Sequence, residues 1–247
     1  MKTILIGNGY WGNIIKGKLS DITQLLYTAD SKTNLDELLE KSDVDYVFIC
    51  TPTKTHYDIV KKCIKNKKNI FCEKPFTGDI NKAIELYELA EKYGVEIYVD
   101  NIFLSRDEFS PHINNHKNST TFKFEWYKYE EKFKENLLHT LLYHDLYLLI
   151  EMTDDLWVVE ERVISDNELF LKLSNKGKVS TFHYNRKIKG SKIKKITIDD
   201  DIIDFSNPKN NPLFEVITTL KDGDINLDYN KKVTMKTLKL LNDIKIL

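Results

Sequence analysis

The sequence predicts an α/β chain in two parts: a doubly wound parallel sheet, then an open, mostly antiparallel sheet with helices on one face. Two observations support this fold class. Over about the first hundred residues, short aliphatic runs alternate with stretches of helical apolar spacing. Beyond them, several runs alternate between apolar and polar residues, as in strands with one buried face. We therefore expect a first domain over residues 1–103 and a second over residues 104–247.

The first domain is expected to alternate between strand and helix. The aliphatic runs typical of buried parallel strands are Thr3–Ile6, Leu25–Ala29, Val44–Cys50, Asn69–Glu73 and Val95–Val99. Helices are expected between them at about Ile14–Ser20, Leu35–Leu39, about His56–Asn66 and Asp79–Tyr93. Asn34 is suited to cap the second helix and Gly94 to end the fourth. Ligands bind at the carboxyl ends of such strands, so polar residues there are candidates for a site.

The second domain is expected to be an antiparallel sheet with helices on one side. Half-buried strands are predicted at Phe122–Trp126, Leu156–Val163, Glu168–Leu173, Lys178–Tyr184 and Ile193–Ile198. Helices are predicted at about Glu135–Glu151 and about Tyr229–Leu241, with packing of the last helix back toward the first domain left open. The aromatic alternation ending at Trp126 suits the sheet core or a homo-oligomer face on this sheet.

Composition excludes several classes of partner. Lys and Arg total 37 against 38 Asp and Glu, so there is no electrostatic case for nucleic acid or for an anionic membrane. No apolar run reaches the ~18 residues of a membrane span, and glycine interrupts the N-terminus too early for a signal peptide. Cys50, Cys63 and Cys72 form no C-x-x-C pair, which indicates reduced thiols in a cytoplasmic protein.

A glycine motif follows the first predicted strand and opens a helix. Its residues are Gly7, Asn8, Gly9, Tyr10, Trp11 and Gly12, which fit G-x-G-x-x-G. The first glycine permits a tight turn, the second lets the backbone approach a pyrophosphate, and the third lets helix and strand pack closely. The helix N-terminus favours the phosphate charge. We interpret the motif as a dinucleotide-binding loop; the alternative is a structural turn.

Asp30 ends the second predicted strand, 18 residues beyond Gly12 (30 − 12). An acid at about this distance can accept hydrogen bonds from the adenosine ribose, and it repels a 2′-phosphate. This favours NAD over NADP, although Ser31 and Lys32 follow and could soften the preference. The alternative is a turn aspartate.

Two further polar stretches follow the third and fourth predicted strands. The first runs from Thr51 and Pro52 to His56, and its hydroxyls and amides could line the ribose and nicotinamide side of a cofactor. An ordinary helix-capping loop is the alternative. The second is Glu73-Lys74-Pro75, where proline favours an extended conformation for Lys74.

Together, the phrases GNGYWG, CTPTKTH and FCEKPFT resemble the glucose–fructose oxidoreductase / inositol dehydrogenase / rhizopine-catabolism (Gfo/Idh/MocA) family. The resemblance implies a Rossmann-type domain and an open-sheet domain. It also implies NAD(P)-dependent hydride transfer at a hydroxyl or keto carbon of a sugar, cyclitol or nucleotide-sugar, with surface-glycan biosynthesis as one setting. It places Lys74 beside the nicotinamide and the reacting carbon, and Glu73 near the nicotinamide ribose.

The family also carries a catalytic histidine on a helix of the second domain. The phrase LLYHDLYLL resembles that helix and assigns the role to His144. The family's aspartate, four residues earlier, is replaced by Thr140, and its preceding glycine run by Lys134-Glu135-Asn136. Asn101, Thr140 and His144 are the predicted substrate contacts. A hydrogen-bonded helix histidine without a site role is the alternative for His144.

The expected mechanism has Lys74 hydrogen-bonding the reacting oxygen while His144 exchanges the hydroxyl proton. No metal is expected, and the H-x-x-x-H pair His112 and His116 is interpreted as a loop. Arg106 fits a substrate contact or a surface position equally. A non-catalytic or regulatory dinucleotide-binding protein is the alternative function, and a methyltransferase is disfavoured by the E-K-P and T-P-T-K-T-H phrases.

Overall fold

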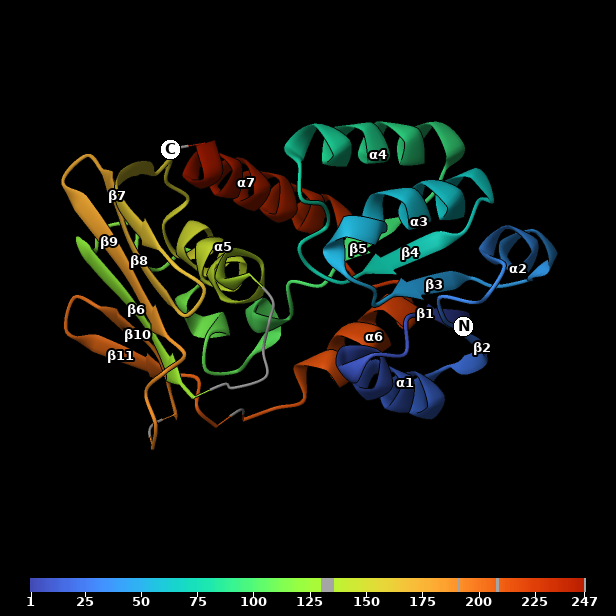
Figure 1. The fold of residues 1–247 in the computed structure, drawn as a ribbon, viewed down its shortest axis with the longest axis horizontal. Coiled ribbons are helices and arrows are strands. Elements are labelled where there is room, and N and C mark those ends of the chain that lie inside the picture. The colour runs from blue at the N-terminus through green and yellow to red at the C-terminus, as the bar shows by residue number, and fades with distance from the viewer. Residues whose placement is uncertain (130–135, 191, 208, 247) are drawn as a thin grey trace. The chain divides into compact units, whose positions relative to one another are not determined.

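The computed structural model describes residues 1–129, 136–190, 192–207 and 209–246. Contacts group the chain into two compact units. The first contains Met1–Ile102 and Pro212–Leu238, and the second contains Phe103–Asn211 and Lys239–Leu247. One unit holds a parallel sheet and the other a mixed, mostly antiparallel sheet, which confirms the predicted fold class (Figure 1).

The sheet of the first unit has the strand order β2-β1-β3-β4-β5, and the described neighbours pair in parallel. Its strands are β1 (Lys2–Ile6), β2 (Gln24–Ala29), β3 (Tyr46–Ile49), β4 (Asn69–Cys72) and β5 (Ile97–Val99). The last residues of these strands are in register across the whole sheet, since Ile6 pairs with Ala29 and Ile49, Ile49 with Cys72, and Cys72 with Val99. The carboxyl ends of the strands therefore lie along one edge of the sheet.

Helices cover both faces of this sheet (Figure 1). They are α1 (Tyr10–Ile22), α2 (Leu35–Lys41), α3 (Thr53–Lys65), α4 (Ile80–Tyr93) and α6 (Pro212–Asp222). The pair α3 and α4 lies on one face and the pair α1 and α6 on the other. Under α1 and α6, the rings of Phe48, Phe71 and Tyr98 stack across neighbouring strands with centroids 4.7 and 5.5 Å apart. Asn34 caps α2 through Glu37 N–H, and Gly94 ends α4 at φ 65°.

The C-terminal segment completes the first unit. Helix α6 was not expected from the sequence, and its buried Leu213, Val216, Ile217 and Leu220 pack into the core cluster of this unit. Helix α7 (Leu227–Ile246) is longer than the helix expected at about 229–241. Within the unit, the Asn230 side-chain amide accepts from Val99 N–H and donates to the Val99 carbonyl, both at 2.8 Å. It thereby satisfies backbone groups of the edge strand β5 that a neighbouring strand would otherwise bind.

The sheet of the second unit has the order β11-β10-β6-β9-β8-β7. Its strands are β6 (Thr121–Lys128), β7 (Val158–Ile164), β8 (Glu168–Asn175), β9 (Lys178–Asn185), β10 (Lys192–Ile198) and β11 (Asp201–Asp204). The described pairs are antiparallel except β6 with β9. Alternate residues of β6, β9 and β10 are buried, so one face of the sheet forms the core.

A helical segment covers that buried face (Figure 1). It begins with a π-helix (Leu138–Leu142) and continues as α5 (Tyr143–Thr153), whose residues are all buried. Tyr184 of β9 donates to Asp145 of α5 at 2.7 Å, which ties helix to sheet. The predicted helix start at Glu135, and Lys134 before it, lie outside the described residues. Strand β11 was not expected. Over the part of the chain that the structure describes, no helix is long and apolar enough to cross a bilayer.

Candidate functional site

A row of residues follows the last paired position of each strand in the parallel sheet. These residues are Gly7, Asp30, Cys50, Glu73 and Asp100. The backbone N–H groups of Gly7, Cys50, Glu73 and Asp100 each continue the ladder to the neighbouring strand at 2.8–2.9 Å. The sequence-predicted positions of the first unit thus meet along one edge, as expected from parallel strands.

The three glycines of the loop after β1 differ in why the structure needs a residue without a side chain at each position. Gly7 has φ 106°, and a Cβ there would lie 2.5 Å from the Cys50 carbonyl oxygen. A Cβ on Gly12 would lie 2.1 Å from the Gly7 carbonyl oxygen. Both glycines are therefore required by the packing of loop, strand and helix. A Cβ on Gly9 would meet nothing within 4 Å, so its absence leaves an open space that the chain does not fill.

The N-terminus of α1 opens toward that space. Gly9 is its N-cap, no side chain caps the first turn, and the first turn contains no acid. Asn13 Nδ2 lies 2.9 Å from the Asn8 carbonyl and 3.0 Å from the Gly9 carbonyl, which holds the loop against the helix. Uncapped N–H groups beside an open glycine suit a pyrophosphate. Tyr10 and Trp11, which are 77% and 51% exposed, flank it.

Asp30 organises a tight turn directly after β2. Its carboxylate accepts from Lys32 N–H at 2.9 Å and from the Thr33 hydroxyl at 3.3 Å. The residue is exposed, so the turn presents the carboxylate to solvent at the sheet edge. Both the predicted ribose contact and the turn role are compatible with this position.

The loop after β3 caps helix α3. The Thr55 hydroxyl lies 2.8 Å from both the Thr51 hydroxyl and the Pro52 carbonyl oxygen. His56 is fully buried, with Nδ1 2.9 Å from the Pro75 carbonyl and Nε2 2.8 Å from the Thr51 carbonyl. It therefore ties the loop after β3 to the loop after β4.

The charge state of His56 follows from its surroundings. Burial lowers the pKa of the ring, and the charge of Lys74 acts in the same direction, whereas hydrogen bonds to the backbone of Thr51, Pro75 and Phe76 oppose both. A neutral imidazole carries one N–H, so it donates to one of the two carbonyls at a time. The ring thus positions Thr51 and Pro75, while its predicted cofactor contact stays a prediction.

Glu73 and Lys74 lie at the carboxyl end of β4, and the Lys74–Pro75 peptide bond is cis. Asp100, which follows β5, is buried and hydrogen-bonded to the Glu73 carboxyl. Burial and this neighbour raise the pKa of Asp100 well above its usual range, whereas Lys74 opposes the shift. Two carboxyl groups in such a contact share a proton. The edge thus combines a lysine with two hydrogen-bonded carboxyl groups, of which Asp100 has a raised pKa.

Three further side chains lie at this edge: Cys72 and Asn101 are buried, and Cys50 is half-buried. Burial raises the pKa of both the Cys50 and Cys72 thiols, so these remain protonated at neutral pH. Asn101 donates through Nδ2 to the Thr234 hydroxyl at 3.2 Å, while its Oδ1 has no hydrogen-bond partner among the described residues. Asn101 therefore anchors α7 within the first unit; its predicted substrate contact stays a prediction.

In the second unit, His144 lies in the first turn of α5. Its Nδ1 is 2.9 Å from the Tyr147 hydroxyl, and its ring stacks on Phe103 with centroids 4.3 Å apart. The Tyr147 hydroxyl also accepts from Phe103 N–H at 3.2 Å. These contacts fix the orientation of the imidazole. In the tautomer that donates from Nδ1 to Tyr147, the lone pair is on Nε2, which is the form that can accept a proton.

Thr140 occupies the position where the family resemblance places an aspartate. Its hydroxyl donates to the Asn136 carbonyl at 3.0 Å and accepts from an Arg186 guanidinium N–H at 2.9 Å. A neutral hydroxyl thus faces an arginine here. His112 and His116 hydrogen-bond to each other, with His112 Nδ1 2.8 Å from His116 Nε2.

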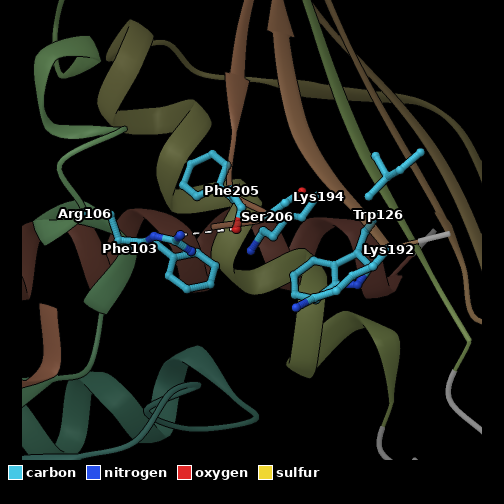
Figure 2. A pocket seen from close by; sticks show the side chains of 8 residues that line it. Phe103, Arg106, Trp126, Lys192, Lys194, Phe205 and Ser206 are labelled. Atoms are coloured by element: carbon cyan, nitrogen blue, oxygen red, sulfur yellow. Dashed lines mark hydrogen bonds between the residues drawn. The ribbon is translucent and has the colours of Figure 1, made fainter. Parts of the chain in front are cut away.

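Beside His144, the second unit has a small pocket of about 110 Å³ (Figure 2). Three of its walls are aromatic, from Phe103, Trp126 and Phe205, and three cations line it, Arg106, Lys192 and Lys194. The Lys194 Nζ lies 3.5 Å from the Phe103 ring centroid and 4.1 Å from that of Trp126. Phe103 is shared between the pocket and the His144 stack.

Most of this pocket was missed by sequence reasoning, which named only Arg106 and Trp126 and left their roles open. One signal was available. Lys194 has the same strand phase as the buried Ile196 and Ile198, so the alternation of β10 places a lysine on the core-facing side. Phe103 and Phe205 gave no comparable signal, because each lies outside a regular strand.

Comparisons with known proteins agree with this architecture. Residues 18–101 match the GFO_IDH_MocA profile, described as an oxidoreductase family with an NAD-binding Rossmann fold. Over 59 residues the chain is 49% identical to uncharacterized oxidoreductase C115.03 of Schizosaccharomyces pombe, covering 24% of this chain and 16% of that protein. The match thus spans about a sixth of that relative's length.

Two solved structures resemble the chain over nearly its whole length. UDP-N-acetylglucosamine 3-dehydrogenase GnnA from Acidithiobacillus ferrooxidans has a TM-score of 0.84 at 18% identity, covering 100% of this chain and 97% of that one. The WlbA (WbpB) dehydrogenase from Thermus thermophilus, in complex with NAD and UDP-GlcNAcA, has a TM-score of 0.80 at 15% identity, covering 98% and 94%. At these identities the likeness shows the fold. The match of residues 18–101 confirms the resemblance of this part of the chain to the Gfo/Idh/MocA oxidoreductase family.

Proposed function

We propose that the protein is an NAD(P)-dependent oxidoreductase that transfers a hydride to or from a hydroxyl or keto carbon of a sugar, cyclitol or nucleotide-sugar. The match of residues 18–101 to an oxidoreductase family supports the reaction class. The structural neighbour with bound NAD and UDP-GlcNAcA supports the substrate class.

The observation that carries the proposal is the edge of the parallel sheet. There the open space at Gly9 and the uncapped start of α1 fit a dinucleotide. The same edge holds Lys74 beside the Glu73–Asp100 acid pair. A phosphate cradle and a lysine on one edge suit a cofactor-dependent reaction better than a structural turn.

The nicotinamide, when bound, supplies the hydride chemistry. We assign to Lys74 the hydrogen bond to the reacting oxygen, where its ammonium stabilises the negative charge that develops during oxidation. His144 takes the hydroxyl proton on Nε2 and returns it during reduction, with Tyr147 holding the ring in place. We also assign to Asp100, whose pKa the Lys74 charge lowers, a part in holding Lys74 at the sheet edge.

Cofactor choice depends on the turn after β2. The exposed Asp30 carboxylate would accept from the ribose hydroxyls of NAD and repel the 2′-phosphate of NADP. We therefore propose NAD as the preferred nucleotide. The predicted contacts of Thr51, Pro52 and Glu73 belong to the nicotinamide side of the same site.

The proposal is tested by calorimetric titration and by turnover. We expect NADH to bind in the micromolar range or tighter, whereas S-adenosylmethionine should not bind. NAD⁺ reduction is then followed with UDP-N-acetylglucosamine, UDP-glucose and myo-inositol as candidate substrates. Tight binding of S-adenosylmethionine without NADH binding would refute the proposal and favour a methyltransferase.

A second function is favoured by one specific observation. The position of the family's aspartate holds Thr140, whose hydroxyl is engaged by Arg186. A site without that acid suits a non-catalytic or regulatory dinucleotide-binding protein. NADH binding without turnover of any sugar in the wild-type protein would support this alternative.

We also propose a homo-oligomer formed through the sheet of the second unit. Apolar side chains on its edge strands are exposed, including Val158, Val163 and Ile202. Light scattering of the purified protein would contradict this if it gave a monomer mass. The cytoplasmic location stays a prediction from the sequence.

A further inference from the structure

We infer that the pocket of the second unit binds a negatively charged group of the substrate, either a phosphate or a carboxylate carried by a sugar. The identity of the ligand as the substrate rests on the proposed function. The preference for negative charge rests on the pocket itself, which lies entirely within one compact unit.

The first argument is the charge of the lining. Arg106, Lys192 and Lys194 line the pocket, and among the described lining residues there is no carboxylate (Figure 2). Cations that converge on a hollow without an acid in its wall are the arrangement that proteins use for phosphate and carboxylate groups.

The second argument is how the cations are held. Lys194 is only 8% exposed, and its ammonium lies against the rings of Phe103 and Trp126. The Arg106 guanidinium donates to the Phe205 carbonyl at 3.2 Å and forms an ion pair with Glu108. These contacts fix both groups before any ligand arrives, which lowers the entropy cost of binding.

Lys194 also has a reason to be buried that core packing does not supply. The neighbouring inward positions of β10, Ile196 and Ile198, are aliphatic, as expected for a core-facing strand. A buried ammonium costs stability unless it gains interactions, and an aliphatic residue would pack at lower cost. The aromatic contacts and the attraction to the buried Asp145 carboxyl recover part of that cost, and an anionic ligand adds to these interactions.

The third argument is position and size. The pocket shares Phe103 with the stack that orients His144, so a group bound there lies next to the proposed proton-transfer residue. Its volume of about 110 Å³ is several times the ~10–15 Å³ that a cavity needs to hold one water molecule. That space suits one phosphate or carboxylate group, while the rest of the sugar lies outside it.

The test compares matched sugars by calorimetric titration of the full-length protein, so it does not depend on turnover. Glucose 1-phosphate and glucuronate are the charged probes, and glucose is the neutral reference for both. We expect at least one of the two charged probes to bind at least about tenfold more tightly than glucose. This preference should shrink as salt is added. The tighter of the two probes identifies phosphate or carboxylate as the group.

Lys194→Met removes the charge while keeping the length of the side chain. It should lower the affinity for the charged probe about tenfold or more and leave glucose binding unchanged. Lys195→Met is the matched control. Lys195 is the next residue of β10 and lies on the opposite face of the strand, with its Nζ 3.2 Å from Glu125 Oε2. Removing the Lys195 charge should leave the affinity for the charged probe unchanged. Lys194→Arg keeps the charge and should retain the preference. Thermal unfolding shows that each variant is folded.

Several outcomes would overturn the inference. The wild-type protein alone refutes it if glucose and both charged probes bind equally, or if neither charged probe binds. An equal loss of affinity in Lys194→Met and Lys195→Met also refutes it. If the protein binds NADH but not the charged sugars, the inference about the pocket is refuted and the proposed function is not. A protein that binds the charged sugars but not NADH refutes the proposed function alone.

Discussion

Alanine at Gly9 and at Gly12 should separate ligand binding from folding. At Gly12 the new Cβ would lie 2.1 Å from the Gly7 carbonyl oxygen, whereas ordinary contact begins at 3.4 Å. The backbone must therefore shift by about 1.3 Å (3.4 − 2.1) between α1 and the loop after β1. Overpacking of this kind costs about 1–3 kcal/mol or more. Gly12→Ala should be clearly less stable than the wild type.

At Gly9 the same methyl group meets nothing within 4 Å, and φ is −70°, which alanine adopts freely. The stability of Gly9→Ala should fall by no more than about 1 kcal/mol, the cost of a poorer N-cap. Its affinity for NADH should fall at least about tenfold, because the methyl group occupies the space assigned to the pyrophosphate. Urea denaturation measures the first effect and calorimetry the second. A folded Gly9→Ala protein that binds NADH as tightly as the wild type would refute the reasoning.

Three further substitutions test other parts of the structure. Asp30→Ala should weaken NADH binding about tenfold and reduce the ratio of NADH affinity to NADPH affinity, both measured by calorimetry. An unchanged ratio would contradict the ribose role of Asp30. Burial and Glu73 raise the pKa of Asp100, so the wild type loses stability as pH rises above the ordinary carboxyl range. Asp100→Asn does not titrate, and its Tm relative to the wild type should therefore rise as pH increases above about 4, the ordinary carboxyl pKa; a pH-independent difference would count against the acid pair. Hydrogen bonds from Thr121 N–H and its neighbours lower the pKa of Asp199 to about 2. That stabilisation is present at neutral pH and is lost as pH falls toward about 2. The carboxylate is exposed, so solvent screening reduces its contribution. Asp199→Asn, which tolerates the φ of 47° at this position, should therefore be less stable than the wild type by no more than about 1 kcal/mol in urea at pH 7 and nearly equal to it in strong acid.

The parallel sheet and its ligand edge were predictable because their signals are local. The predicted runs end one residue before Gly7, Asp30 and Asp100 and at Glu73, and parallel pairing then brings these ends together. The alternating strands of the second unit were predictable for the same reason. What the sequence did not predict is β11, a strand of only four residues.

Helix α6 shows a different limit. Leu213, Val216, Ile217 and Leu220 have clear helical spacing, but the helix follows the strands of the second unit and packs in the first. Order along the chain gave no reason to place it there.

The pocket of the second unit depends on contacts between distant segments. Lys194 meets Trp126 because β10 pairs with β6, and Phe103 and Phe205 reach the same point from outside the strands. Strand order is a property of the whole sheet, so the sequence could place Lys194 on a face without indicating its neighbours. The same is true of His56, whose two carbonyl partners come from different loops.

Hydride transfer assisted by Lys74 is the central claim, and one comparison tests it directly. Lys74→Met and Lys92→Met, a control on the exposed last turn of α4, are compared with the wild type in NAD⁺ reduction with the best of the candidate substrates. NADH affinity is measured for all three proteins. We predict that Lys74→Met keeps NADH binding within a few fold but loses about a hundredfold to a thousandfold in kcat, while Lys92→Met behaves as the wild type. A Lys74→Met protein that turns over at the wild-type rate would contradict the account.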